Sequence, residues 1–365
     1  MKVPYHIIKS TNNCIAAVYN NKIKIKNLNT NETVELNQDE VKKTNIRSIN
    51  FNNDASILAV ASDDKNLKFW NVKTGECLLT KNTPKKVNSL VFENNGRNVL
   101  VADGFGDVYR YSVDDSEENG KLMLGHVSML TDILLSKDEK YVITSDRDEK
   151  IRITNYPKTY IIKTFCLGHK EYISKMHFIP NNESLLLSGG GDEYLFLWDF
   201  INAKIIQKID IKTLIEDTIK NNNLNPVETY NVKEITCYPK GNLIAVCFEK
   251  LPAIFIFDFK NNELNLKDTV ITKNLILDIT FDNNGRLWIT NFVDKNTKEL
   301  ITVVSKLSPV EYFPQKELKF FENTEDSEEI DINKYMTTEN LRKDVLDAKK
   351  AQQEEENSSK RQKTK

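Results

Sequence analysis

Residues 145 to 175, SDRDEKIRITNYPKTYIIKTFCLGHKEYISK, gather side chains that could carry out acid–base chemistry. Asp146 and Asp148 could serve as acid and base, His169 could orient one of them, and Arg147 could hold an anion. The same residue types are also common in the turns between strands. The pattern of the elements around them must therefore decide between an active site and a set of structural turns.

Motifs for catalysis or cofactor binding do not accompany this stretch. The glycine clusters DGFGDV and SGGGDEY do not continue as G-x-G-x-x-G into a helix, and no G-x-S-x-G, H-E-x-x-H or phosphate-loop pattern occurs. The four histidines have no metal-binding spacing, and the five cysteines form no CxxC pair. We therefore expect no catalytic residue, no cofactor-binding residue and no metal ligand in this chain.

The overall charge limits which kinds of partner the chain can attract. A net charge of −2 gives no general attraction to nucleic acid or to anionic membranes, so any RNA contact must be a local patch. The first residues, MKVPYHIIKS, have no apolar core of signal-peptide length, and no run of about 18 apolar residues occurs. We expect no membrane partner and a location in the nucleus, with the cytoplasm as the alternative.

One pattern recurs along the chain: a short apolar strand, a turn, a second apolar run, an acidic turn, and an alternating strand that ends in an aromatic residue. The clearest copies begin at residues 46, 87, 130 and 173. Aligned on their acidic turns, they place Trp70, Tyr111, Thr154 and Trp198 at one position, 41, 43 and 44 residues apart. This period is typical of WD40 repeats, in which each copy forms one blade of a β-propeller.

Two copies begin with Gly-His, at His126 and His169. In such a repeat the histidine can join a serine of the second strand, an aspartate of the next turn and a tryptophan of the third strand in one buried hydrogen-bonded set. This predicts structural roles for His126, His169, Ser188, Asp192, Trp198, Trp70 and Asp148.

Weaker copies bring the total to seven blades. We expect an all-β, seven-bladed WD40 β-propeller over residues 1–312, because one blade alone cannot bury both of its faces. Residues 208–231 are an insertion between the fifth and sixth blades, and IKTLIEDTIK within it has the pattern of a short amphipathic helix. Residues 313–365 form a charged tail, mostly disordered, with one helical pattern at 338–356.

Four sequence segments appear in order within residues 101–200: GDVYRY, LGHVSMLTD, SDRDEKIRI and FCLGHKEYIS. Over this region the chain resembles the WD-repeat non-catalytic subunit of tRNA (guanine-N7)-methyltransferase. The resemblance implies a heterodimer with a separate catalytic subunit, which binds S-adenosylmethionine and methylates a guanosine in the tRNA variable loop. The WD-repeat subunit itself carries no catalytic residues, supports the active form of its partner and helps to place the tRNA.

The resemblance also points to contact residues. Glu171 and Lys175 match positions at which the family's WD-repeat subunit meets the methyltransferase, and their even spacing in a strand would put them on one side. The alternative is an ordinary intramolecular salt bridge. Arg147 belongs to the family pattern too, and could bind the neighbouring acidic turn, the partner or an RNA phosphate.

Basic residues are the candidates for RNA contact. Lys42, Lys43, Arg47, Lys85 and Lys86 lie just before the inner strands of two consecutive blades, where they could meet tRNA phosphates. The alternative is ordinary surface lysines. At the end of the chain, Lys360, Arg361 and Lys363 could form a nuclear import signal or an RNA-binding arm. A generic WD40 scaffold or adaptor remains the alternative function, since a propeller fold does not fix function.

Overall fold

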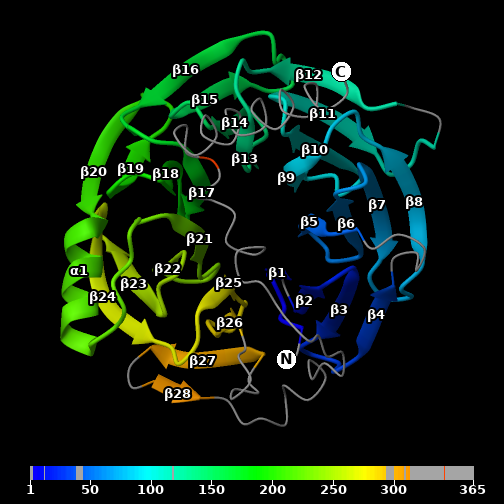
Figure 1. Cartoon of the computed structure of the whole chain (residues 1–365). Coiled ribbons are helices and arrows are strands. Elements are labelled where there is room, and N and C mark those ends of the chain that lie inside the picture. Colours follow the sequence, from blue (N-terminus) through cyan, green and yellow to red (C-terminus); the bar gives the residue numbers. More distant parts are fainter. Residues whose placement is uncertain are drawn as a thin grey trace, which may run out of the picture.

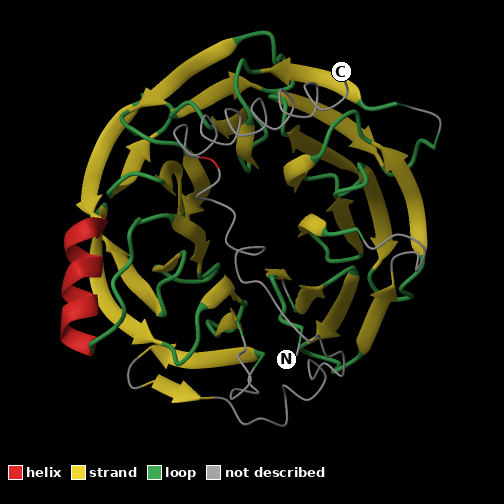
Figure 2. Cartoon of the chain, viewed as in Figure 1, coloured by secondary structure: helices red, strands yellow, loops and turns green. Residues whose placement is uncertain are grey.

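The computed structural model describes residues 3–11, 13–37, 44–116, 119–292, 300–307, 310–312 and 341, with the backbone alone at 305–307 and 310–312. Within these residues the chain forms seven four-stranded sheets, arranged as blades around a central channel (Figure 1). Figure 2 shows that strands make up the ring and that the helix α1 lies at its outer edge. The predicted seven-bladed propeller is confirmed.

Each blade uses four consecutive antiparallel strands, numbered from the channel outwards. The strands are β1 to β4 at Ile7–Thr11, Cys14–Tyr19, Lys22–Asn27 and Thr33–Asn37; β5 to β8 at Ile46–Phe51, Ile57–Ser62, Asn66–Asn71 and Cys77–Asn82; β9 to β12 at Val87–Phe92, Asn98–Asp103, Asp107–Ser112 and Lys121–Gly125; β13 to β16 at Leu130–Leu135, Tyr141–Asp146, Lys150–Asn155 and Ile162–Leu167; β17 to β20 at Ile173–Ile179, Asn182–Gly190, Tyr194–Asp199 and Lys204–Asp210; β21 to β24 at Val232–Cys237, Leu243–Phe248, Ala253–Lys260 and Glu263–Ile271; and β25 to β28 at Ile276–Phe281, Leu287–Asn291, Ile301–Leu307 and Val310–Tyr312.

The burial of a strand depends on its place in the blade. The second strands β2, β6 and β10 are buried at every residue, as expected where neighbouring blades cover both faces of a sheet. The outermost strands β8 and β16 are largely exposed. Trp70, Tyr111, Thr154 and Trp198 are each the fifth residue of a third strand, so the sequence alignment matches the strand register.

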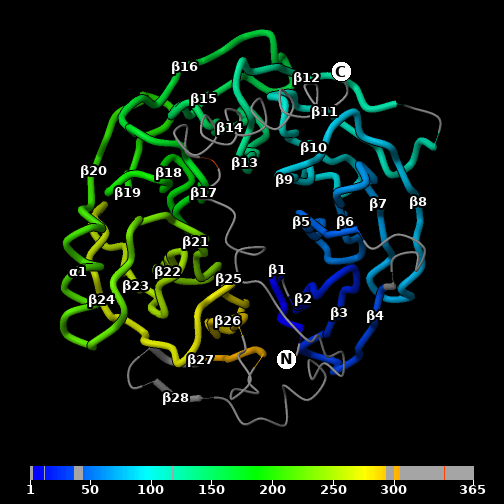
Figure 3. The backbone as a smooth tube through the Cα atoms, viewed as in Figure 1, coloured from blue at the N-terminus to red at the C-terminus, as the bar shows by residue number. Residues whose placement is uncertain are grey.

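The ring closes between the first and seventh blades without an exchange of strands. Figure 3 follows the chain once around the channel until β25 and β26 lie beside β1. The Ile8 amide donates to Asp278 Oδ2 at 2.8 Å, and the hydroxyls of Ser10 and Thr280 lie 3.1 Å apart. Apolar side chains of both blades, including Tyr5 and Trp288, complete this junction.

Between the fifth and sixth blades the chain forms the helix α1, Ile211–Asn222. Asp210 caps its N-terminus by accepting from the Thr213 amide at 3.0 Å, and Asn223 ends it with a φ of 53°. Ile211 and Ile215 are buried against the two blades. No helix among the described residues has the length and apolarity needed to cross a membrane. The predicted tail at 313–365, with its helical pattern at 338–356, lies outside the described residues apart from residue 341.

Candidate partner-binding rim and central channel

One end of the propeller carries two kinds of connection: the loops that lead into the inner strands and the turns between second and third strands. We call this end the upper rim; in blades 3 to 5 it comprises residues 83–86, 104–106, 126–129, 147–149, 168–172 and 191–193. Backbone hydrogen bonds tie each turn to the loop of its own blade. Gly104, Arg147 and Gly191 donate to Lys86, Met129 and Tyr172 at 2.9, 2.9 and 3.0 Å. The rim is therefore a fixed surface.

The fifth blade contains the full hydrogen-bonded set of the repeat. Trp198 Nε1 donates to Ser188 Oγ at 2.8 Å, Ser188 Oγ lies 2.7 Å from His169 Nε2, and His169 Nδ1 lies 2.9 Å from Asp192 Oδ2. Because a tryptophan can only donate, Ser188 Oγ accepts from Trp198 and lies within hydrogen-bond distance of His169 Nε2 as well. All four side chains are buried, so the set holds the loop to the sheet.

The fourth blade uses a different aspartate from the predicted one. His126 Nδ1 lies 3.1 Å from Asp146 Oδ2, and His126 Nε2 lies 2.8 Å from Thr144 Oγ1. The structural role predicted for Asp148 thus belongs to Asp146, which is the last residue of β14 and is buried, whereas Asp148 lies in the turn and is partly exposed. Burial lowers the pKa of His126, although its hydrogen bond to Asp146 opposes the shift.

Two positions in the predicted sets lack the tryptophan hydrogen bond. Thr154 stands where the fifth blade has Trp198, and Arg152 Nε donates to its Oγ1 at 3.1 Å. Trp70 is buried, but its Nε1 has no hydrogen-bond partner among the described residues. Among the described residues, the complete set is therefore found in the fifth blade alone.

Arg147 and Glu171 both lie on the upper rim. Arg147 occupies the turn after β14, with Nε 3.8 Å from Asp148 Oδ1. Glu171 lies in a bend before β17, which begins at Ile173. The expectation that Glu171 and Lys175 share a side because they share a strand is therefore wrong, since only Lys175 belongs to the strand.

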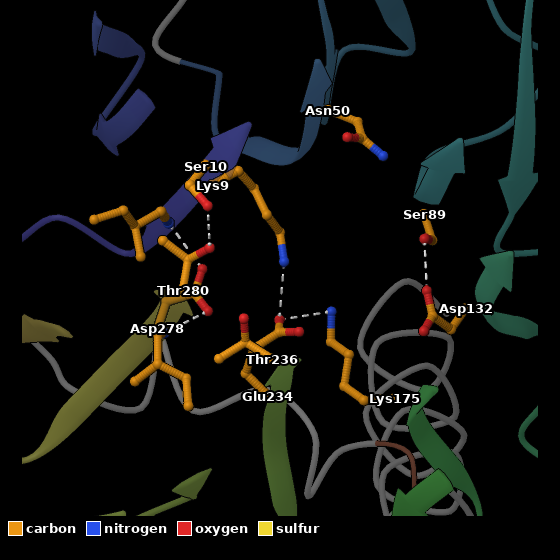
Figure 4. A network of polar contacts seen from close by, with 12 residues as sticks. Lys9, Ser10, Asn50, Ser89, Asp132, Lys175, Glu234, Thr236, Asp278 and Thr280 are labelled. Carbon is orange, nitrogen blue, oxygen red and sulfur yellow. Dashed lines mark hydrogen bonds and ion pairs between the residues drawn. The ribbon is translucent and has the colours of Figure 1, made fainter. Parts of the chain in front are cut away.

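Lys175 lies in the central channel rather than on the outer surface. Its Nζ is 3.0 Å from Glu234 Oε2, and Lys9 Nζ approaches the same oxygen at 3.4 Å (Figure 4). The Glu234 side chain is 9% exposed, whereas that of Lys175 is 30% exposed. Water in the channel therefore screens this ion pair, which weakens it relative to a fully buried one.

The channel charges shift one another's pKa. Burial opposes ionisation of Glu234, but Lys175 and Lys9 lower its pKa to about 2. Burial, together with the negative charge of Glu234, raises the pKa of Asp278 to about 6. For Lys175, burial disfavours the charge, but the surrounding carboxylates, led by Glu234, keep its pKa above the usual value.

A β-bulge precedes three of these residues in their inner strands. The register shifts between Ile173 and Lys175, and homologous shifts precede Glu234 and Asp278. Lys175 and Glu234, together with Lys9 and Asp132, line a cavity of about 970 Å³ in the channel. The sequence analysis missed Glu234, Lys9 and Asp278, although Glu234 and Asp278 align with Lys175 in the repeat.

Of the predicted RNA contacts, three are in the described part of the chain. Arg47 lies inside β5, not before it, and donates to Val87 O, Asp63 Oδ1 and Asn88 Oδ1 at 3.1, 3.1 and 2.7 Å. Lys86 Nζ also lies 3.1 Å from Asp63, while Lys85 Nζ lies 3.8 Å from the centroid of the Phe105 ring. The candidates outside the described residues are Lys42, Lys43, Lys360, Arg361 and Lys363.

Within the described ranges, no group of three or more His, Cys, Asp or Glu side chains is placed to hold a metal ion. In the 145–175 stretch, His169 and Asp146 instead bind other residues of their own blades. The geometry therefore supports a rigid binding surface.

Comparison with known proteins points to one family. The family model described as the tRNA methyltransferase TRM82 WD40 domain matches residues 10–121 and 112–311. A solved structure titled Crystal Structure of Mitotic Checkpoint Complex contains a chain with a TM-score of 0.66 and 16% identity, covering 80% of this chain and 90% of that one. At this identity it supports the fold alone.

Curated relatives carry the name tRNA (guanine-N(7)-)-methyltransferase non-catalytic subunit. The match to the Xenopus laevis protein has 33% identity and covers 67% of this chain and 61% of that protein; for the Homo sapiens protein the values are 30%, 66% and 58%. For the Meyerozyma guilliermondii protein they are 30%, 73% and 73%. The chain thus spans about three fifths of the length of the vertebrate relatives it matches. This chain belongs to the tRNA methyltransferase TRM82 WD40 domain family.

Proposed function

We propose that this chain is the non-catalytic subunit of a heterodimeric tRNA (guanine-N7)-methyltransferase. The observation that carries the proposal is the extent of the family match, which runs from residue 10 to residue 311 and so reaches all seven blades. Relatives from a frog, a mammal and a yeast share that name.

In this proposal the chemistry belongs to the partner. The catalytic subunit binds S-adenosylmethionine and transfers its methyl group to N7 of a guanosine in the tRNA variable loop. The propeller contributes a surface fixed by backbone hydrogen bonds, so little of its conformational freedom is lost on docking. Binding only the active form of the catalytic subunit raises the population of that form.

The proposal assigns contacts to particular residues. Arg147 and Glu171 on the upper rim would meet the catalytic subunit, and Lys175 would do so from the channel. Lys85 and Lys86 would lie near tRNA phosphates. The terminal Lys360, Arg361 and Lys363 would serve either nuclear import or RNA binding, and the heterodimer would act in the nucleus.

The test of the function is reconstitution. The catalytic subunit from the same source, expressed alone, should form N7-methylguanosine in tRNA at least about tenfold more slowly than the pair, because its active conformation is then less populated. Equal rates with and without the propeller chain would refute the supporting role. Capture of an unrelated assembly instead of a methyltransferase would favour a general scaffold.

Lys9 provides a matched control for Lys175, because both lysines lie beside Glu234. Lys175→Glu should abolish co-purification of the catalytic subunit, whereas Lys9→Glu, which alters the other lysine beside Glu234, should retain it. Both variants place a second carboxylate near Glu234, so thermal unfolding of each must be compared first. Equal retention of the partner by two folded variants would remove Lys175 from the interface.

A further inference from the structure

Exposed apolar side chains are concentrated on one side of the ring. Among the described residues, the large exposed hydrophobics lie mostly in blades 3 to 5, at Phe105, Leu122, Val127, Tyr160, Ile161, Ile162, Phe165, Leu167, Ile205 and Ile206. The two others, Leu78 and Leu266, stand singly in β8 and β24. Single exposed apolar residues are normal on a soluble protein, but a group of them marks an interaction site.

The upper rim holds one part of this group in a rigid form. Phe105 is 67% exposed at the tip of a turn in which Asp103 Oδ1 accepts from the amides of residues 105, 106 and 107 at 2.8, 3.1 and 3.0 Å. A Cβ on Gly106, whose φ is 108°, would lie 2.6 Å from His126 O. The turn therefore packs against the loop that carries the fully exposed Val127.

The outer side of blades 4 and 5 holds the other part. β16 is the outermost strand of its sheet and pairs only with β15, and Leu167 at its end is 62% exposed. Ile205 belongs to β20, the outermost strand of the next blade, and its Cδ1 would lie 3.3 Å from a Cβ on Gly168. Ile205 therefore lies beside Gly168, the residue that follows Leu167.

The charges beside the part of this surface on β16 and β20 are positive. Residues 157–170, PKTYIIKTFCLGHK, contain three lysines and no acidic residue, and residues 200–209, FINAKIIQKI, contain two lysines and no acidic residue. A complementary partner surface is apolar at its centre and acidic at its edge. RNA fits less well, because single-stranded RNA binds such sites by stacking on aromatic rings, and most of these side chains are aliphatic.

We infer that the exposed apolar residues of blades 3 to 5, on the upper rim and on β16 and β20, form the surface that the catalytic subunit covers. This inference rests on the proposed function and specifies its interface. Phe105 and Leu167 act as apolar anchors, and the lysines beside them pair with acidic groups of the partner at the edge of the contact.

Aspartate substitutions in different blades test where the catalytic subunit binds. Leu167→Asp and Phe105→Asp should each weaken binding of the catalytic subunit to the full-length chain by about tenfold or more, because each puts a charge into a desolvated contact. Leu78→Asp and Leu266→Asp are matched controls, because these leucines are 45% and 42% exposed in outermost strands outside blades 3 to 5. Titration calorimetry gives the affinities, and thermal unfolding of each isolated variant checks that it folds.

Each result has a distinct meaning. Equal affinity of all four variants, with tight binding by the wild-type chain, would overturn the inference and leave the proposed function intact. A wild-type chain that does not bind the catalytic subunit would overturn both. A Leu167→Asp variant that lowers the melting temperature of the isolated chain, or dissociates a homodimer seen in sedimentation, would assign the surface to the chain's own tail or to a second copy. That outcome also overturns the inference.

Discussion

Each of the two rim histidines uses both ring nitrogens. His169 and His126 are buried, and a buried imidazole with an unpaired nitrogen would lose the hydrogen bond that water provides in the unfolded chain. Both blades meet this requirement with a hydroxyl on one nitrogen and an aspartate on the other. The aspartate comes from a different position in each blade: Asp146 is the last residue of β14, whereas the last residue of β18 is Gly190 and Asp192 follows in the turn.

A pair of substitutions distinguishes the roles of Asp146 and Asp148 in the fourth blade. Asp146→Ala should lower the free energy of unfolding by about 1–3 kcal/mol, because it leaves His126 Nδ1 and the Lys150 amide without their acceptor. Asp148→Ala should cost less than about 1 kcal/mol, since its contact with Arg147 is partly exposed. Urea unfolding of both variants gives the comparison, and equal losses would contradict the assignment of Asp146.

At the scale of elements, two features interrupt the regular repeat: a bulge in several inner strands and the helix α1 between blades 5 and 6. A bulge precedes Lys175, Glu234 and Asp278 in β17, β21 and β25, and a bulge changes the direction of a side chain relative to a regular strand. The helix α1 is held at one end by its cap and along one side by Ile211 and Ile215. Its stability is therefore partly local.

The cap of α1 can be tested with a second aspartate of the same segment. Asp210→Ala should destabilise the helix by about 0.5–2 kcal/mol, because the amide of Thr213 loses its acceptor. Hydrogen exchange should become faster at the amides of α1 while those of the buried strand β18 keep their protection. Asp217→Ala, on the exposed face of the helix, is the control. Unchanged exchange in α1 would show that packing alone fixes the helix.

At the scale of the whole molecule, the ring depends on a junction between residues far apart in the chain. The Ile8 amide and Asp278 Oδ2 join the first and last blades, and no strand crosses between the two sheets. The carboxylate of Asp278 is buried, which stabilises the bond to the amide but disfavours the charge. Closure of the ring is therefore coupled to pH.

The direction in which pH changes the stability follows from the direction of the pKa shift of Asp278. The pKa of Asp278 rises from its ordinary 3.8 to about 6 on folding, so folding favours the protonated form and this contribution to stability is lost as pH rises from about 4 through 6. Glu234 has a lowered pKa of about 2, so its contribution is lost only when the pH falls below its ordinary pKa of 4.5.

Asp278→Asn removes the charge without removing the carbonyl acceptor. Between pH 4.5 and 7.5 the variant should gain stability relative to the wild type by on the order of 2 kcal/mol. Burial lowers the pKa of another group, His126, so the measured quantity is the difference between the two proteins in urea unfolding at each pH. Asp217→Asn is the exposed control. A difference that does not change with pH would show that Asp278 has an ordinary pKa.

The repeat period determined much of this structure in advance. A spacing near 43 residues, an aligned aromatic position and the Gly-His pairs were enough to predict seven blades and the set around His169, because these features are local to one blade. The identity of the aspartate that binds His126 could not be predicted, since Asp146 and Asp148 are only two residues apart and the folded positions of their side chains choose between them. The same limit applied to Glu171, whose bend before β17 breaks the alternation assumed for a strand.

By itself, the sequence determined the kind of ring this is and the family to which it belongs. Only the tertiary structure decided which residues meet in the channel and which are exposed together on the surface. Lys9, Lys175, Glu234 and Asp278 come from four different blades and meet because closure of the ring brings the inner strands around one channel. The exposed residues of blades 3 to 5 become one surface for the same reason: residues far apart along the chain become neighbours only when the blades pack side by side.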